Sequence, residues 1–461
     1  MRKLCLLTLI MLATCDICAA RKDWKRMQSV VSAIRETDFP TRHFSITDYH
    51  HNGDTLYTDA INTAITICSN MGGGTVDIPD GMYYSGPITL RSNVNLHLGD
   101  HTTLKFITDR KVFNTVLTRI EGIDCQNLSP LIYAYDAENI AITGKGTLDG
   151  QASEENWFNP DVLNNLKLRD GRIGHEKTLL NEALEHALPI EERIFAGDEG
   201  MRPQFINLYK CRRILIEDVE IVNSPFWLIH PLLSEDIIVR GVKMVSHGRN
   251  NDGCNPESCK NVLIEDCYFD TGDDCIAIKS GKEGDGRRWN VPSQNIIIRH
   301  CRMRDGHAAV AMGSEITGGC HDVWVEDCLM DSPNLTRIIR IKSNPQRGGE
   351  VRNIFVRNIE VGECGLAILG IEMNYWNVKE GPFLPYFHHI TMENIRSKKS
   401  RYVLHVDGLR QAARTSHIKL KDCSFSGVTE SDVNYTSGTA DISFIDVKVN
   451  GKKYEYKKTI N

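Results

Sequence analysis

Three aspartates, a histidine and an arginine–lysine pair lie within residues 250–342, each beside a glycine or inside a short apolar run. These groups are Asp252, Asp273, Asp274, His307, Arg340 and Lys342. Carboxylates held close together cannot all stay ionised at little cost, so the pKa of one of them rises. A protonated acid then coexists with an ionised base, which is the pair that glycosidic hydrolysis requires. Arginine together with lysine suits a sugar that carries a carboxylate.

A degenerate repeat carries these residues. Each copy has a polar residue, three or four mostly apolar β-formers and a polar pair. The copies begin at Asn139, Arg213, Asp236, Asn261, Asn295, Asp322, Asn353, His389 and His417. From Ile214 onward, the steps between first apolar positions are 23, 25, 34, 27, 31, 36 and 28 residues. This pattern predicts an all-β fold, a single-stranded right-handed parallel β-helix, rather than a β-sandwich or a propeller with blades of about 40–50 residues.

The repeat also predicts that the candidate residues share one face. Asp252 lies 15 residues after the start of its apolar run, and Asp273 and His307 each lie 11 residues after theirs. Because successive rungs stack about 4.8 Å apart, groups separated by ninety residues in sequence meet at one site. Arg340 and Lys342 alternate with an isoleucine and therefore point to the same side.

The remaining segments predict a capped β-helix with one insertion. Thr58 to Ser69 has the periodicity of an amphipathic helix, which we expect at the N-terminal end of the stack. Residues 150–202 break the rhythm and contain a helical run from Lys177 to His186. They are interpreted either as a solvated decoration or as a wall that closes one end of a groove. We expect one β-helix domain over residues 21–461.

Residues 1–20 have the features of a signal peptide: two basic residues, an apolar run from Leu4 to Ala13, and Cys18-Ala19-Ala20 for cleavage. The run is too short to span a bilayer, so we expect export to the periplasm or outside the cell, without a membrane span. A lipoprotein anchored through Cys15 is the alternative. The net charge of −6, with both signs scattered, argues against nucleic-acid binding.

The fifteen cysteines of an exported chain suggest disulfides. Four of them follow the apolar run of a repeat at the same offset, and we expect these to pack inward as small apolar side chains. They are Cys267, Cys301, Cys328 and Cys423. Cys254 and Cys259, five residues apart, are the pair expected to be oxidised most readily, and a bridge between neighbouring rungs is the alternative. No compact cluster has the spacing of metal ligands, so no metal site is expected.

The four motifs resemble, in order and spacing, those of glycoside hydrolase family 28, the polygalacturonases and related pectin hydrolases. That family's pattern is N-T-D-G-x-D, then G-D-D, then G-H-G with G-S, then R-I-K. It is matched here by segments that begin at Asn250, Gly272, Gly306, Gly313 and Arg340. The resemblance extends over nearly the whole chain after residue 20, including the N-terminal helix and the G-G-G-T-V-x-I-P segment that follows it.

The resemblance implies a role for each residue. Asp273 would be the general acid, Asp252 and Asp274 would activate the attacking water, and His307 would support the acid. Arg340 and Lys342 would bind a galacturonate carboxylate, and Asn250 and Glu315 complete the predicted substrate-binding set. The resemblance implies no metal or cofactor, and it implies pectin or galacturonan oligomers as the partner. We expect a monomer.

Three positions depart from the family pattern: Asn251, Asn255 and Ala308. The second replaces a carboxylate, which affects the expected substrate preference more than the reaction type. Segments such as Asn344 to Gly349 look like those of bacterial members, many of which are exo-acting, so cleavage from a chain end is expected. Two alternatives are a pectate-type lyase on the same fold and a non-catalytic carbohydrate-binding β-helix.

Overall fold

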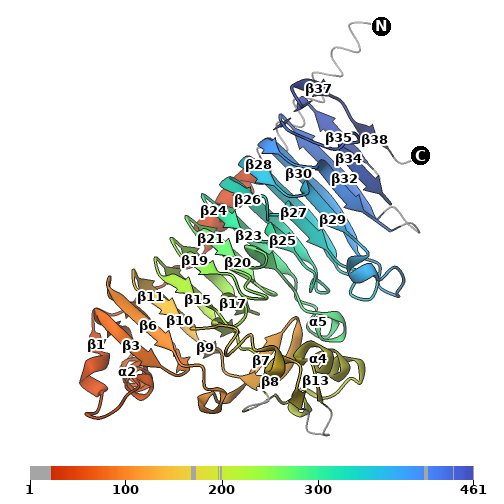
Figure 1. The fold of residues 1–461 in the computed structure, drawn as a ribbon. Helices are drawn as coiled ribbons and strands as arrows, with labels where there is room; N and C mark the ends of the chain where they lie inside the picture. The colour runs from red at the N-terminus through yellow and green to blue at the C-terminus, as the bar shows by residue number, and fades with distance from the viewer. Residues whose placement is uncertain are drawn as a thin grey trace, which may run out of the picture.

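The structure, a computed structural model, describes residues 22–167, 173–195, 197, 200–409, 414–439 and 441–459. The predicted signal peptide, with Cys15, lies outside these residues. The described chain winds into a right-handed parallel β-helix, as predicted (Figure 1). Each rung contributes one strand to each of three faces, and a single core fills the space between them.

The first face contains the apolar runs of the repeat. Its strands are β1 (His43–Ser45), β2 (Gly74–Ile78), β5 (Val94–Leu98), β10 (Glu138–Gly144), β15 (Arg212–Glu217), β18 (Glu235–Arg240), β20 (Lys260–Glu265), β23 (Ser293–Arg299), β26 (Cys320–Ser332), β28 (Glu350–Cys364), β30 (Tyr386–Lys399), β32 (Thr415–Lys421) and β35 (Ile442–Ile445). These strands pair in parallel, with the first apolar position of one run beside that of the next, as Ile237 lies beside Val262 and Val262 beside Ile296.

The second face follows directly in the chain. Its strands are β3 (Gly81–Ser85), β6 (Thr102–Phe106), β11 (Thr147–Asp149), β16 (Glu220–Val222), β19 (Lys243–Ser246), β21 (Tyr268–Thr271), β24 (Arg302–Asp305), the second halves of β26, β28 and β30, β33 (Ser424–Phe425) and β36 (Val447–Val449). Two antiparallel strands, β37 (Lys452–Tyr454) and β38 (Lys457–Lys458), finish the stack at its C-terminal end.

The third face carries the candidate site. Its strands are β4 (Ile88–Thr89), β9 (Ile132–Tyr135), β14 (Ile206–Tyr209), β17 (Ile229–Leu232), β22 (Ile276–Ile278), β25 (Ala308–Met312), β27 (Arg337–Lys342), β29 (Ala367–Glu372), β31 (Tyr402–Asp407) and β34 (Asn434–Ser437). Isolated bridges through Cys254 connect β17 to β22, so the face is continuous along the stack.

The polar residue that opens each copy of the repeat has a structural cause. Its backbone is left-handed at every copy, with φ between 53° and 61°. Asparagine, aspartate and histidine adopt this conformation more readily than most residues. Successive side chains also bond to one another: Asn261 Nδ2 donates to Asp236 Oδ1 at 3.0 Å, and Asn295 Nδ2 donates to Asn261 Oδ1 at 3.0 Å. The ladder of polar side chains therefore fixes the point where each rung turns.

The cysteine predictions are partly right. All twelve cysteines in the described part of the chain are free and buried. Cys267, Cys301, Cys328 and Cys423 pack inward in the main core, as predicted. The expected disulfide between Cys254 and Cys259 is wrong, and no described rung is bridged to its neighbour. The thiol of Cys259 instead donates to the backbone carbonyl of Pro231 at 3.2 Å, because both cysteines serve as small core residues.

Two helices cover the ends and outside of the stack. The predicted helix is α2 (Thr58–Asn70), which buries Ile61 and Ile65 against the first rungs. A second helix, residues 22–33, was not predicted and lies outside the first face. Its Met27 packs in a cluster with Trp324, and Arg26 is bonded to Asp322 across 296 residues of sequence. Among the described residues, no helix is long and apolar enough to cross a membrane.

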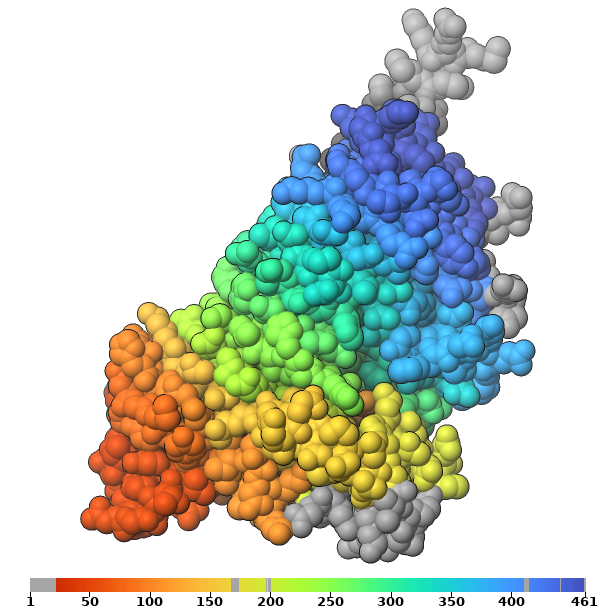
Figure 2. Space-filling model, in the orientation of Figure 1, coloured from red at the N-terminus to blue at the C-terminus, as the bar shows by residue number. Residues whose placement is uncertain are grey.

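Segments that leave the rungs build a wall beside the third face. The wall consists of the antiparallel hairpin β7 (Thr115–Ile120) and β8 (Ile123–Leu128), of α3 (Pro160–Leu163), the short pair β12 (Leu166–Lys167) and β13 (Ile173–Gly174), α4 (Glu176–Glu185) and α5 (Glu283–Trp289). The predicted helical run is thus α4, whereas the hairpin was not foreseen. Figure 2 shows the yellow part of this wall standing in front of the green rungs.

Buried ion pairs join the wall to the β-helix. Arg119 of β7 donates to Asp124 Oδ1 at 2.7 Å and to Glu257 Oε1 at 3.1 Å, and both of its partners are fully buried. His230 of β17 donates through Nε2 to Glu257 Oε2 at 2.9 Å. Arg193 and Asp285 form a further buried pair at 2.5 Å. These six residues are called the wall cluster below.

Candidate active site

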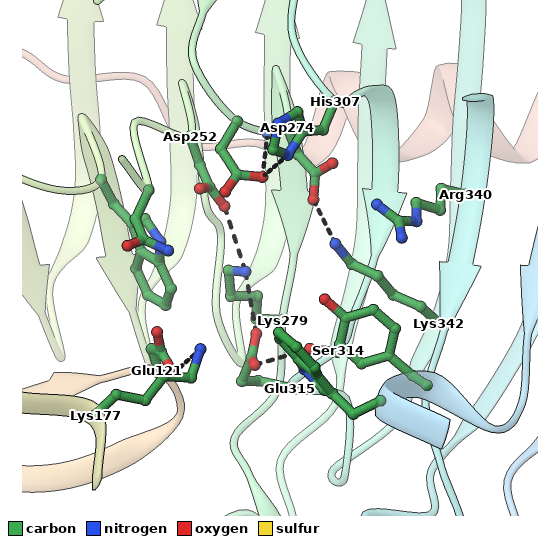
Figure 3. Close-up of a pocket in the computed structure, with 15 residues that line it drawn as sticks. Glu121, Lys177, Asp252, Asp274, Lys279, His307, Ser314, Glu315, Arg340 and Lys342 are labelled. Carbon is green, nitrogen blue, oxygen red and sulfur yellow. Dashed lines mark hydrogen bonds and ion pairs between the residues drawn. The ribbon is translucent and has the colours of Figure 1, made fainter. Parts of the chain in front are cut away.

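One pocket on the third face contains every residue of the predicted site. It encloses about 290 Å³. Its lining includes Asn250, Asp252, Asp273, Asp274, His307, Glu315, Arg340 and Lys342. Figure 3 shows Glu121 and Lys177 at one end, Arg340 and Lys342 at the other, and Asp252, Asp274 and His307 between them. Four successive rungs, from the Asn250 segment to β27, supply the eight predicted residues, so the repeat does bring them to one place.

Asp252 is a buried carboxyl held by two donors. Asn255 Nδ2 lies 3.0 Å from its Oδ2, and Lys279 Nζ lies 3.5 Å from the same oxygen. Burial, reinforced by the neighbouring charge of Asp273, raises the pKa of Asp252 to about 8. Asn255, where the family pattern has aspartate, thus contacts the Asp252 carboxyl through its amide. A fourth carboxylate in its place would add repulsion.

Asp273 has the opposite electrostatic environment. Burial opposes its charge, but a hydrogen bond from His307 and the field of Lys342 outweigh burial and lower its pKa to about 2. His307 Nδ1 donates to Asp273 Oδ1 at 3.0 Å, and the backbone N–H of Asp274 donates to the same oxygen at 2.9 Å. The same hydrogen bond to Asp273 raises the pKa of His307.

The two pKa directions differ from the sequence expectation in one respect. The resemblance makes Asp273 the general acid, whereas its surroundings lower the pKa of Asp273 and raise that of Asp252, which favours the proton on Asp252. The physical reason is the distribution of donors. Asp273 accepts two hydrogen bonds and faces Lys342, while Asp252 is more completely removed from water.

Asp274 is fixed by Lys342. Lys342 Nζ donates to Asp274 Oδ2 at 2.7 Å, and both side chains are buried. Asp274 Oδ1 is also buried but has no hydrogen-bond partner among the described residues. A buried polar atom without a partner is uncommon in proteins, and here it lies at the pocket. The free oxygen marks a position for a hydroxyl or a water molecule.

The cationic end of the pocket is held by a shared carboxylate. Arg340 and Arg337 both pair with Glu372, at 3.2 Å and 2.8 Å. Burial acts against the charge of Arg340, but Asp274 and Glu372 outweigh it and raise the pKa of that guanidinium. Arg340 is therefore a permanent cation in a partly dry site, where its attraction for a carboxylate is stronger than in water.

Glu315 lies in the pocket but has protein partners for both oxygens. Its Oε1 accepts from Ser314 Oγ at 2.9 Å and from Arg347 at 3.3 Å, and its Oε2 accepts from Lys279 at 3.2 Å. The neighbouring cations overcome burial and hold its pKa well below the ordinary value. The geometry favours a countercharge for Lys279 over the predicted contact with substrate.

Several lining residues were missed in the sequence. Lys279 follows the G-D-D motif in the same rung, at the end of the segment Ala277-Ile278-Lys279. Its alternation with the apolar Ile278 could have shown that its side chain points away from the core. Its Nζ lies 4.5 Å from the ring centroid of Trp227, another lining residue. Glu121, Lys177 and Trp376 come from the wall and from η5 (Tyr375–Asn377), which have no place in the repeat.

Lys177 connects the two sides of the pocket. This residue of α4 pairs with Glu121 at 3.2 Å, and its Nζ lies 5.3 Å from the ring centroid of Trp376 in η5. The wall and the loop after β29 therefore meet at one end of the pocket. Asn250, nearby, accepts a hydrogen bond from Arg202 at 3.0 Å.

A group with the composition of a metal site lies outside the pocket. His247, Asp270 and Asp305 place one ligand atom each within 4.8 Å of one another. They come from three rungs, so sequence spacing could not show them. Both oxygens of Asp305 already accept side-chain hydrogen bonds, from Ser332 and Asn334 at 3.0 Å each. We therefore interpret the group as a hydrogen-bonded turn.

Comparison with known proteins gives a consistent result. The family called glycosyl hydrolases family 28 matches residues 196–452. A probable polygalacturonase from Vitis vinifera is 31% identical over 67% of this chain, and an exo-poly-alpha-D-galacturonosidase from Dickeya chrysanthemi is 28% identical over 72% of it. The chain spans 58% and 57% of the lengths of these two relatives.

A solved structure matches over almost its full length. The exopolygalacturonase from Thermotoga maritima superposes with a TM-score of 0.85 at 34% identity. The match covers 94% of this chain and 99% of the other. The similarity thus includes the wall as well as the rungs.

Proposed function

Because this chain belongs to glycosyl hydrolases family 28, we propose that it hydrolyses α-galacturonosyl linkages of pectin from a chain end, with inversion at the anomeric carbon. The observation that carries the proposal is the pocket itself. Asp252, which is buried, and Asp273, which is half-buried, have opposite pKa directions and lie there beside Asp274, His307 and the cations Arg340 and Lys342. Such a pair supplies acid and base at one pH.

The acid in this mechanism is Asp273, through the oxygen that the protein leaves free. Its Oδ1 already accepts from His307 and from the backbone of Asp274, so Oδ2 is available to protonate the leaving oxygen. Arg340 and Lys342 bind the sugar carboxylate. That negative charge offsets the field of Lys342, which, after the hydrogen bond from His307, lowers the pKa of Asp273. Substrate binding therefore moves the shared proton from Asp252 toward Asp273.

The base is formed by Asp252 and Asp274. Asp274 Oδ1 accepts one hydrogen of a water molecule, because it has no described protein partner. Once Asp252 has lost its proton, it removes the second hydrogen as the water attacks the anomeric carbon. The glycosidic bond breaks toward the leaving oxygen, which receives the proton of Asp273. One bond forms and one breaks in a single displacement, so the configuration inverts.

The chain-end specificity rests on the contact between Lys177, Glu121 and Trp376. These groups close one end of the pocket, so a polysaccharide cannot continue past it. The terminal galacturonate would occupy the closed end beside Trp227 and Lys279. The rest of the chain would leave past Arg340.

The test follows products over time from polygalacturonate and a galacturonate trimer, for the wild type and for Asp273→Asn. We expect galacturonate monomer from the earliest times, and a rate about 10²–10⁴-fold lower in the variant, which lacks the general acid. An unsaturated, ultraviolet-absorbing product that disappears with a chelator would indicate a lyase. Mixed oligomers at early times would contradict the closed end. Equal activity of Asp273→Asn would contradict the mechanism.

A further inference from the structure

The face that holds the active site continues past it over three more strands. One line of paired positions begins at Arg340 and continues with Gly370, His405 and Tyr435. A parallel line begins at Lys342 and continues with Glu372, Asp407 and Ser437. Neighbouring strands lie about 4.8 Å apart, so Tyr435 stands roughly 14 Å from Arg340 along the axis. A polysaccharide leaving the pocket in that direction passes over these positions.

The charge of the third face changes at β29. The outward cations Arg337, Arg340 and Lys342 all belong to β27. The positions paired with them on the next three strands are Ala367, Gly370, Glu372, Tyr402, His405, Asp407, Tyr435 and Ser437. None of these residues is a lysine or an arginine. Burial and the nearby Arg337 lower the pKa of His405, so its ring is neutral at pH 7. Beyond β27, these positions no longer attract carboxylates.

Three aromatic rings cover this part of the face. The centroids of Tyr402 and His405 are 5.3 Å apart, and His405 stacks on Tyr435 at 5.0 Å with an interplanar angle of 22°. Tyr435 is 45% exposed, which leaves much of its ring open to solvent. Exposed aromatic faces bind the C–H side of sugar rings, since both surfaces are apolar and flat.

A second hollow of about 400 Å³ adjoins the rings. It is lined by Asn374, Asn377, Lys379, Glu380, Asp407, Gly408, Leu409 and Tyr435. The two asparagines flank Tyr375 and Trp376, which line the catalytic pocket, so η5 forms a ridge between the two cavities. Asp407 accepts a hydrogen bond from Asn374 at 2.9 Å. The lining cation Lys379 has an interaction of its own.

We propose that the platform of Tyr402, His405 and Tyr435, together with this hollow, is a distal subsite for an uncharged sugar unit on the leaving-group side of the substrate. Such a unit is a methyl-esterified galacturonate or a neutral sugar. An ionised galacturonate would meet two carboxylates, those of Asp407 and Glu380, against one cation, Lys379. The inference rests on the proposed function, and it predicts a substrate that is acidic at the cleaved end and uncharged a few units further along.

The experiment compares galacturonate pentamers that differ only in the two units farthest from the cleaved end. These units are free acids, methyl esters or neutral sugars. For the wild type we expect KM several-fold lower with either uncharged form, at an unchanged kcat. Tyr435→Ala should raise KM for the uncharged pentamers about three- to tenfold, the range of one aromatic contact. Asp407→Asn should lower KM for the free-acid pentamer only. Tyr84→Ala, an exposed tyrosine on another face, is the matched control.

A galacturonate dimer separates this inference from the proposed function, because it is too short to reach the rings of Tyr402, His405 and Tyr435. Hydrolysis of the dimer with equal KM for all pentamers would overturn the distal subsite alone. A preference for uncharged units that persists in Tyr435→Ala and Asp407→Asn would also overturn it. If nothing is hydrolysed, the proposed function fails. Calorimetric binding of the pentamers then decides, with weaker binding to Tyr435→Ala supporting the subsite and unchanged binding overturning it.

Discussion

Two neighbouring groups of buried charges, the wall cluster and the carboxylates of the pocket, have different roles. In the wall cluster, burial opposes the charges of Asp124 and Glu257, but Arg119 outweighs burial and lowers the pKa of both carboxyls. In the catalytic pocket, burial dominates at Asp252 and raises its pKa to about 8. In the wall cluster an arginine binds each carboxylate directly, whereas in the pocket the cation paired with Asp252, Lys279, lies 3.5 Å away.

The difference separates a structural from a chemical use of buried charge. Wall carboxylates have their oxygens occupied by donors on both sides, as Glu257 is bound by Arg119 and His230. In the pocket, Asp274 has one oxygen paired with Lys342 and one without a described partner. Incomplete pairing is unfavourable for stability and leaves atoms available for substrate and water. Substitutions in the two places should therefore have different consequences.

The largest effect is expected from Lys342→Met in the pocket. The substitution removes a substrate cation and the partner of Asp274, so kcat/KM should fall by about 10³-fold. The freed carboxyl can take up a proton, so the free energy of unfolding should change much less. Steady-state kinetics and thermal melts measure the two effects. Lys243→Met, at an exposed pair with Glu220, is the control. A fall below tenfold would contradict the role of Lys342.

Glu257→Gln in the wall cluster should have the opposite pattern. It removes the buried anion shared by Arg119 and His230 and leaves Arg119 with Asp124 alone, and breaking such a buried pair costs about 3–5 kcal/mol of unfolding free energy. The wall should loosen, so polygalacturonate should yield short oligomers in addition to monomer, while dimer hydrolysis continues. Denaturant melts and product analysis test both points. Glu393→Gln breaks a half-buried surface pair with Lys421 and should cost at most about 1 kcal/mol. Equal losses of unfolding free energy in Glu257→Gln and Glu393→Gln would contradict a special structural role for the wall cluster.

A third effect concerns the pH dependence of stability, through Asp252. Below pH 4 this carboxyl is protonated in both the folded and the unfolded chain. Between pH 4 and about 8 the unfolded chain loses the proton and the folded protein keeps it, so stability falls as pH rises through this window. Asp252→Asn cannot ionise, so its melting temperature relative to wild type should rise from pH 4 to pH 8. A constant difference across that range would show that the folded pKa is not raised.

Much of the fold was predictable because one physical pattern recurs. Apolar side chains must face inward in every rung, and the turn before each run requires a left-handed residue, so both features mark the sequence repeatedly. The helix at Thr58 and the phase of Asp252, Asp273 and His307 follow from the same periodicities. The helix over residues 22–33 was not predicted, because it packs on the outside of the stack and the repeat marks only the side chains that face the core.

The site was less predictable where it depends on segments without a repeat. Glu121, Lys177 and Trp376 lie in the wall and in η5, and only tertiary packing brings them to the pocket. The proton on Asp252 also depends on which donors surround each carboxyl, which spacing cannot reveal. The disulfide prediction was wrong because it relied on export, which suggests oxidation. A narrow β-helix core instead needs small apolar side chains in many rungs. Cys254 and Cys259 meet that need as free thiols.

The helix over residues 22–33 determines an order of assembly. Arg26 and Met27 contact Asp322 and Trp324, which leave the ribosome about 300 residues later. This segment emerges before any rung, yet its binding surface exists only when rungs up to β26 have formed. It can therefore dock only late in folding, across a sequence separation that makes its closure slow. Until then this helix stays undocked. Its docking shows that the middle rungs of the β-helix have formed.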